Sequence, residues 1–239
     1  MANGIYAAAA GIAAQQTRID AITNDLANSD TPGYKSERIG FEDLLYGSEG
    51  GVPVGSGSTA IDLGPSTTAG PIDASDNPLS VAISGSGYLQ FRRSTGGIGL
   101  SRDGDLEIDA TGSLVASTGE QLVPPVKVPI GTDPSDVAIG SDGTVSVRGR
   151  TMGKIQVVDV GVPTALQPVG SNMLAVTAAS GRATPVKNPG LEQGQTEGSN
   201  VNVDEAMTDL LDAQQNYTLL SHAISTQDQL LQIANQLRS

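Results

Sequence analysis

Both ends of this 239-residue chain carry apolar residues at alternating intervals of three and four, the spacing of a helix that packs along one narrow stripe. At the N-terminal end the stripe recurs every seven positions, with two further members three positions later: Ile5, Ile12, Ile19 and Leu26, with Ala8 and Ile22. No proline interrupts residues 3–28, and Pro32 in a cluster of turn formers cannot continue a helix. The sequence therefore predicts an α-helix over residues 3–28.

The C-terminal end has the same pattern over a greater length. Asn202 is a suitable N-cap, with Glu205 three residues later and Val201 placed as a hydrophobic staple. The stripe that follows comprises Ala206, Leu210, Ala213, Tyr217, Leu220, Ile224, Gln227, Leu231 and Ala234. A helix of about 35 residues would span roughly 50 Å, which is long for a globular domain. We expect the two terminal helices to pair as a coiled coil.

The predicted seam between the helices comprises the larger apolar residues of both stripes: Ile5, Ile12, Ile19, Ile22, Leu26, Leu210, Tyr217, Leu220, Ile224 and Leu231. Small or polar residues such as Ala13, Gln15 and Ala213 lie among them, and small residues permit close packing of several helices. Two interpretations follow. The helices either pair within one chain and support the rest of it, or neighbouring subunits complete an assembly seam.

The middle of the chain has a different composition. Residues 47–75 are rich in Gly, Ser, Thr and Pro, which indicates a linker or an extended segment. Residues 76–190 contain short alternating runs separated by turn signals, which predicts a small all-β domain. The predicted strands cover residues 79–83, 88–91, 106–108, 126–130, 137–139, 145–147 and 155–160.

The predicted fold class is therefore α+β, with a mainly antiparallel β domain inserted between paired terminal coiled-coil helices. The expected parts are an inner helical domain (1–46 and 200–239), the linker (47–75), the β domain (76–190) and a return linker (191–199). Tyr and Phe together number seven and Trp is absent, so a core must consist of aliphatic residues. This composition favours thin or elongated units over one bulky globule.

Composition excludes several kinds of site. The chain has no cysteine, which rules out disulfides, thiol nucleophiles and cysteine-ligated metals, and a single histidine rules out sites with two imidazoles. Lys and Arg number 13 against 26 Asp and Glu, a net charge of −13, which disfavours nucleic-acid binding through a basic face.

No motif predicts an enzyme, a cofactor or a metal site. The carboxylate cluster at residues 103–109 lacks the glycine and the carboxylate that an EF-hand calcium loop needs at its sixth and twelfth positions, where Ile108 and Leu114 stand. It is better interpreted as a strand with Leu106 and Ile108 facing inward. His222 lies beside the C-terminal stripe without a nucleophile motif, and we interpret it as solvent-facing or interhelical.

The N-terminal residues lack the basic region of a cleavable signal peptide, and no apolar run approaches the length of a membrane span. We therefore expect the protein either to stay in the cytosol or to leave it by a route that needs no such signal.

The terminal motifs resemble those of the bacterial flagellar rod and hook axial proteins. Residues 10–20 and 41–46 are similar to the family's N-terminal signature, as is the motif Leu26, Ala27, Asn28, Thr31, Pro32, Gly33, Tyr34 and Lys35. Residues 197–203 and 223–237 are most similar to the distal rod members, and residues 77–83 and 101–104 match more loosely. The resemblance covers nearly the whole chain.

The resemblance implies a structural subunit of the flagellar basal body in the cell envelope. In this family the terminal helices pack with those of neighbouring subunits into a hollow helical rod, and the β domain forms its outer layer. The implied partners are further copies of the chain, neighbouring rod and hook proteins, the surrounding ring proteins and the flagellar type III export apparatus, which needs no cleavable signal. No nucleic acid, cofactor or small-molecule substrate is implied.

Phe41 and Leu45 resemble a short export element of this system, a phenylalanine followed four residues later by an apolar residue. The alternative is that the two side chains pack on one helical turn. For the whole chain, the alternatives are a proximal rod or hook-type protein and, in a different class, a secreted adhesin stalk with a ligand-binding β module.

Overall fold

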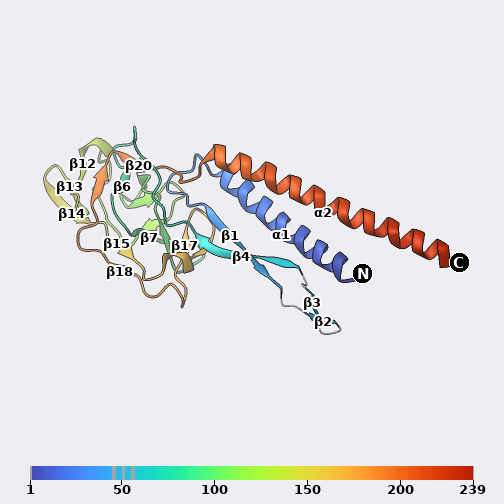
Figure 1. Ribbon diagram of the computed structural model, residues 1–239. Helices are drawn as coiled ribbons and strands as arrows, with labels where there is room; N and C mark the ends of the chain where they lie inside the picture. Colours follow the sequence, from blue (N-terminus) through green and yellow to red (C-terminus); the bar gives the residue numbers. More distant parts are fainter. Residues whose placement is uncertain (1, 45–46, 50–51, 55–56, 239) are drawn as a thin grey trace. The chain divides into compact units, whose positions relative to one another are not determined.

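The computed structural model describes residues 2–44, 47–49, 52–54 and 57–238, and the chain divides into two compact units (Figure 1). Unit 1 comprises residues 1–27, 37–63 and 202–239, and unit 2 comprises residues 28–36 and 64–201. Each unit is therefore assembled from segments that lie far apart in the sequence.

Unit 1 contains two long helices, α1 (Ala2–Ala27) and α2 (Val203–Arg238). They run antiparallel, because Arg18 pairs with Asp209 while Gly11, nearer the N-terminus, faces Leu220, which lies further along α2. The prediction of one helix at each end of the chain is confirmed. Among the described residues, neither helix is both long and apolar enough to cross a membrane.

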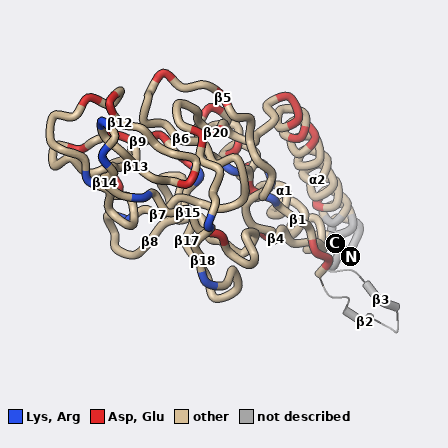
Figure 2. Tube along the Cα trace, turned by 90° about the vertical axis from the view of Figure 1, so that its left-hand side faces the viewer, with Lys and Arg blue, Asp and Glu red and all other residues tan. Residues whose placement is uncertain are grey.

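The start of α2 follows the predicted capping pattern. Asn202 Oδ1 accepts a hydrogen bond from the Glu205 N–H at 3.3 Å, and Asn202 O accepts one from the Ala206 N–H at 2.9 Å. Asp204 and Glu205 occupy the first turn, where carboxylates interact favourably with the helix dipole. Acidic residues are visible on these first turns in Figure 2.

The chain between α1 and the β core contains strands. In a two-stranded sheet β1 (Glu37–Asp43) pairs with β4 (Ser58–Pro65), and β2 (Gly47–Glu49) pairs with β3 (Val52–Val54). Residues 47–75, for which a linker or an extended segment was expected, thus hold β2, β3, β4 and also β5 (Ile72–Ala74) of unit 2.

Unit 2 contains most of the strands of the chain. They are β6 (Val81–Ile83), β7 (Tyr88–Arg92), β8 (Ile98–Ser101), β9 (Leu106–Ile108), β10 (Leu114–Ala116), β11 (Gln121–Leu122), β12 (Val137–Ile139), β13 (Thr144–Val147), β14 (Arg150–Lys154), β15 (Val157–Asp159), β16 (Gln167–Pro168), β17 (Leu174–Ala175), β18 (Thr184–Pro185), β19 (Leu191–Gln193) and β20 (Gln195–Glu197), with short 3-10 helices at Pro134–Asp136 and Pro163–Ala165.

These strands form a nine-stranded sheet of order β16-β17-β8-β7-β11-β10-β9, with β15 pairing both β7 and β18. A three-stranded sheet has the order β12-β13-β14, and β19 pairs with β6 and β20 with β5. Every strand pair with a defined register is antiparallel.

The core of unit 2 is aliphatic, as the composition predicts. Its main cluster consists mostly of Leu, Val and Ile side chains, with Phe91 as the aromatic member, and includes Leu79, Leu89, Leu106 and Leu114. A smaller cluster surrounds Leu100 and contains Tyr88. Some strands alternate between buried and less buried residues, as β13 does, whereas all three residues of β6 and of β10 are buried, so burial of apolar surface stabilises the sheets.

Most of the predicted strands are present, but the strand at residues 126–130 is wrong. Only an isolated bridge, Ser113 to Lys127, occurs there. Val126 and Val128 are buried, yet Pro125 and Pro129 lack the N–H groups that a ladder needs, so the segment packs without forming a strand. Ile130, predicted as its last residue, is 81% exposed.

Substitution of Gly104 tests the close packing of unit 2. A Cβ at this position would lie 1.8 Å from Val81 O, the carbonyl of a core strand. We expect Gly104→Ala to lower the free energy of unfolding by about 2–3 kcal/mol, measured by denaturant titration with circular dichroism. Gly85→Ala is the matched control, because its nearest atom, Pro189 O, would be 3.9 Å away. Equal effects of the two substitutions would contradict this packing.

Candidate functional site

One face of α2 is covered along most of its length. The less exposed residues include Ala206, Leu210, Ala213, Tyr217, Leu220, Ile224 and Gln227, which is the predicted stripe. Ala213 is fully buried. The side chains of Leu231 and Ala234, the last two members of the stripe, lie outside the described residues. The alternation of three and four therefore identifies the face that α2 turns toward the rest of unit 1.

The deepest burial on α1 does not follow its predicted stripe. Ile5, Ile12, Ile19, Ile22 and Leu26 are each only partly buried. The buried residues of α1 are instead Ala14, Ala21 and Asp25. This helix contacts β1 as well as α2, so two neighbours together determine which of its side chains are buried deepest.

The contact between the helices combines close approach with few polar interactions. A Cβ at Gly11 would lie 3.2 Å from Leu220 Cδ1, so the absence of a side chain there leaves room for the leucine. Arg18 Nη2 donates to Asp209 Oδ1 at 3.0 Å, but both side chains are substantially exposed and the pair stabilises the contact little. Gln15 Oε1 is buried and, within the described residues, accepts no hydrogen bond.

Large apolar residues also lie on the exposed side of α2, and sequence reasoning missed them. They lie off the predicted stripe and among polar residues: Val203, Met207, Leu211, Leu219, Leu230 and Ile233. The sequence did contain an indication, since these large apolar residues lie outside the stripe that recurs at intervals of three and four. Leu211 is 59% exposed and Leu219 is 66% exposed, so these side chains gain little from folding of the single chain.

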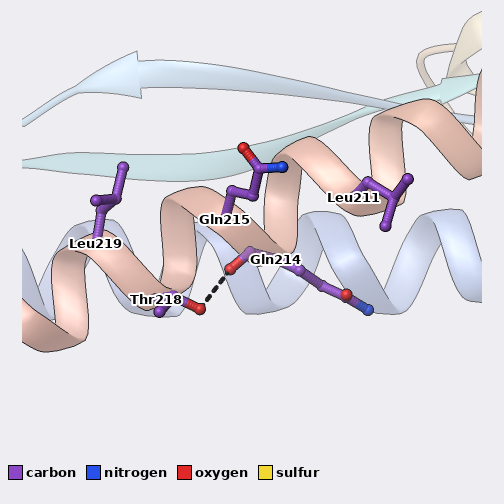
Figure 3. A pocket seen from close by; sticks show the side chains of 5 residues that line it. All are labelled: Leu211, Gln214, Gln215, Thr218 and Leu219. Atoms are coloured by element: carbon purple, nitrogen blue, oxygen red, sulfur yellow. Dashed lines mark hydrogen bonds between the residues drawn. The ribbon is translucent and has the colours of Figure 1, made fainter.

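Two of these leucines border a shallow hollow on α2. The hollow has a volume of about 420 Å³ and is lined by Leu211, Gln214, Gln215, Thr218 and Leu219 (Figure 3). Thr218 Oγ1 donates to Gln214 O at 2.9 Å, which satisfies the hydroxyl within the helix. The lining has no titratable group, so the hollow suits packing by another apolar surface rather than chemistry.

The motif that follows α1 is anchored inside unit 2. Thr31 Oγ1 donates to Asn28 Oδ1 at 3.2 Å, and Asn172 Nδ2 donates to Pro32 O at 2.7 Å. Gly33 has φ +68°, and a Cβ there would lie 2.4 Å from Asp103 N, so both the conformation and the space require glycine. Leu26 and Ala27 are the last residues of α1, and Lys35 is buried.

A polar hollow of about 390 Å³ lies beside this motif within unit 2. Its lining includes Asn28, Thr31, Asn172 and the carboxylates of Asp103 and Asp105. Burial raises the pKa of Asp103 to about 6, assisted by the charge of Asp105 and opposed by the hydrogen bond from the Asp105 N–H. No group of three or more His, Cys, Asp or Glu side chains in the described part of the chain could hold a metal ion.

The remaining described candidate residues lie on β9, α2 and β1. In β9 Leu106 is buried and Glu107 is exposed, as predicted for a strand, and Ile108 packs against the core. His222 is exposed on α2. Phe41 lies on β1 and is 45% exposed, so the alternative of packing on a helical turn is wrong for it. Leu45 lies outside the described residues.

Three family models match the chain. The model described as "Flagella basal body rod protein" matches residues 5–35, the "Flagellar hook protein FlgE/F/G D1 domain" matches residues 82–147, and the "Flagellar basal body rod FlgEFG protein C-terminal" matches residues 192–237. None of these descriptions names a catalytic activity.

Several curated proteins are similar to the chain over its whole length. The flagellar basal-body rod protein FlgG of Caulobacter vibrioides is 35% identical over 97% of this chain and 98% of its own length. FlgG of Buchnera aphidicola subsp. Acyrthosiphon pisum is 32% identical over 99% of this chain and 100% of its own length. The flagellar basal-body rod protein FlgF of Escherichia coli is 29% identical over 100% of this chain and 99% of its own length.

The raised pKa of Asp103 predicts a pH-dependent effect of removing its charge. Because the pKa of Asp103 in the folded chain lies above its ordinary value of 3.8, the charged carboxylate destabilises the folded chain above pH 6, and this cost disappears as the pH falls toward 4. We expect Asp103→Asn to raise the free energy of unfolding at pH 7.5 by about 1–2 kcal/mol, allowing for solvent screening, and to change it little at pH 4.

Asp142→Asn is the control for this measurement. Asp142 is exposed, and hydrogen bonds from the Thr144 hydroxyl and N–H lower its pKa, so its charged form is favoured in the folded chain. We expect no stabilisation from this substitution at pH 7.5. A gain equal to that of Asp103→Asn would contradict the assignment of the effect to burial.

Proposed function

Because the chain belongs to the family of flagellar basal-body rod proteins, we propose that it is a distal rod subunit that polymerises into a hollow helical drive shaft. It is a structural subunit of the flagellar basal-body rod. In the proposed role the polymer transmits torque by subunit packing and leaves a channel through which exported subunits pass. The distal position is supported by relatives described as FlgG, whose identities range from 29% to 35%, against 29% for FlgF of Escherichia coli.

The observation that carries this proposal is that α2 has large apolar residues both on its covered stripe and on its exposed side. The face with the predicted stripe is covered within the chain, where Leu220 meets α1 at Gly11. We propose that this stripe and the seam residues of α1 form an intramolecular coiled coil. The exposed side, with Leu211 and Leu219, is mostly uncovered by the described residues of unit 1 and is proposed to pack against helices of neighbouring subunits.

The remaining assignments follow from the family. The helical domain at residues 1–46 and 200–239 would form the inner layer of the rod, and the β domain at 76–190 the outer layer. Its partners would be further copies of the chain, adjacent rod and hook proteins and the ring proteins around the rod. Export would use the flagellar type III apparatus without a cleavable signal.

Aspartate substitutions on the two faces of α2 test this arrangement. Leu219→Asp should prevent rod assembly, because an unpaired charge would enter a closely packed contact between subunits. It should change monomer stability by no more than about 0.5 kcal/mol, since Leu219 is 66% exposed. Leu220→Asp should prevent assembly and also reduce pairing of α1 with α2, while the melting of unit 2 stays unchanged.

The measurements are electron microscopy of basal bodies from cells that carry each variant and circular dichroism of the purified monomers. Ser225→Asp, which adds the same charge at an exposed polar position of α2, is the control and should assemble. If Leu219→Asp builds a complete rod, the exposed face is not a subunit contact. If Ser225→Asp also fails, charge alone explains the loss.

Phe41 tests the proposed export element. We expect Phe41→Ala to lower the fraction of the protein that leaves the cytoplasm without changing its stability by more than about 1 kcal/mol, because the side chain is 45% exposed. Leu63→Ala, on the partner strand β4 and 41% exposed, is the matched control. Equal secretion of the Phe41 variant and the parent would leave Phe41 with a packing role only.

A further inference from the structure

A buried ionic cluster lies in unit 2. It consists of Lys35, Arg102 and Glu197, hereafter the Glu197 cluster, whose side chains are 6%, 9% and 1% exposed. Glu197 Oε1 accepts hydrogen bonds from Lys35 Nζ and, at 3.0 Å, from the Gly70 N–H. Glu197 Oε2 accepts one from Arg102 Nη1 at 2.9 Å. One carboxylate therefore pairs with two buried cations, which leaves a net charge of +1 on the three side chains.

Each cation also donates to a backbone carbonyl oxygen. Lys35 Nζ donates to Thr68 O at 2.9 Å and Arg102 Nη2 donates to Gly85 O at 2.8 Å. The Arg102 guanidinium also lies 5.6 Å from the centre of the Tyr88 ring. Burial acts to raise the pKa of Glu197, but the hydrogen bonds from Lys35 and Gly70 and the charge of Arg102 outweigh it and hold the pKa below its usual value.

The cluster joins three segments of unit 2, hereafter the flanking segments: residues 28–36, 64–71 and 194–201. Backbone contacts connect them further, since the Gly33 N–H donates to Glu197 O at 2.7 Å and the Gly198 N–H donates to Pro71 O at 2.7 Å. All residues of these segments are described, and neither apolar core cluster contains any of them. Their attachment to the β core thus depends on the pairing of β20 with β5, on other hydrogen bonds and on the Glu197 cluster, with little contribution from large apolar side chains.

The order of the residues along the chain determines when the ion pairs of the cluster can form. Lys35 precedes Glu197 by 162 residues and Arg102 precedes it by 95. While a chain is synthesised or delivered N-terminus first, both cations lack this anion until residue 197 is available. A buried cation without its partner is costly, so Lys35 and Arg102 must stay hydrated until then.

We propose that the Glu197 cluster is a conformational latch that closes only after the C-terminal part of unit 2 is in place, and whose opening releases the three flanking segments together while the β core stays folded. The proposal concerns the single folded chain and does not depend on rod assembly.

Hydrogen exchange measured by mass spectrometry on the monomeric full chain tests the proposal. Glu197→Gln keeps the shape of the side chain and removes its charge. We expect exchange in all three flanking segments to become at least about tenfold faster, and exchange in β7 and β8 to stay as in the parent. Asp136→Asn, which breaks an exposed ion pair with Arg148, is the control and should leave all these rates unchanged.

Lys35→Met is the second variant, because it keeps the pair of Arg102 with Glu197 and decides the question if Glu197→Gln fails to fold. It should accelerate exchange in the same three segments by a smaller factor. Faster exchange spread equally over the β core would overturn the proposal, because the cluster would then belong to the core's own cooperative unit. Unchanged rates, or acceleration of residues 194–201 alone, would overturn it as well.

Discussion

The structure depends on one constraint, that the chain returns to where its first helix ended. The Ser36 N–H donates to Asn200 Oδ1 at 2.8 Å, which holds together residues that are 164 positions apart. The Asn200 N–H donates to Tyr34 O nearby. Because α1 ends just before one of these segments and α2 starts just after the other, the two helices belong to one unit, and the β core is an insertion between them.

The two units use apolar side chains in different ways. Unit 2 buries its large aliphatic residues around Phe91, so its sheets have a closed core despite the small number of aromatic residues. In unit 1 the helices bury mainly alanines, such as Ala14 and Ala213, and leave several leucines of α2 in solvent. Burial of apolar side chains within one chain is therefore sufficient to explain the fold of unit 2, but it does not explain why the helices of unit 1 are so long.

Sequence periodicity predicted both helices, the cap at Asn202 and most strands of the core, because each of these depends on residues that are close in the sequence. It could not predict which side of α1 is buried deepest, since that depends on β1 as a second neighbour. The strand expected at residues 126–130 is absent because Pro125 and Pro129 lack backbone N–H donors, and the spacing of apolar residues carries no information on such donors. The ion pairs of Lys35 and Arg102 with Glu197 carry no local signal at all, since they join segments that only the completed fold brings together.

The unequal lengths of the helices give the helical unit two different ends. α1 has 26 residues and α2 has 36, so at 1.5 Å per residue one helix is longer by about 15 Å. Since the pair is antiparallel and Leu220 already faces Gly11, the surplus lies at the C-terminal end of α2, where Leu230 and Ile233 are exposed. An array of such subunits in one orientation is polar: its two growing faces differ in shape and in apolar character. A different protein can therefore recognise one face and be rejected by the other, which gives such an array an intrinsic direction of growth.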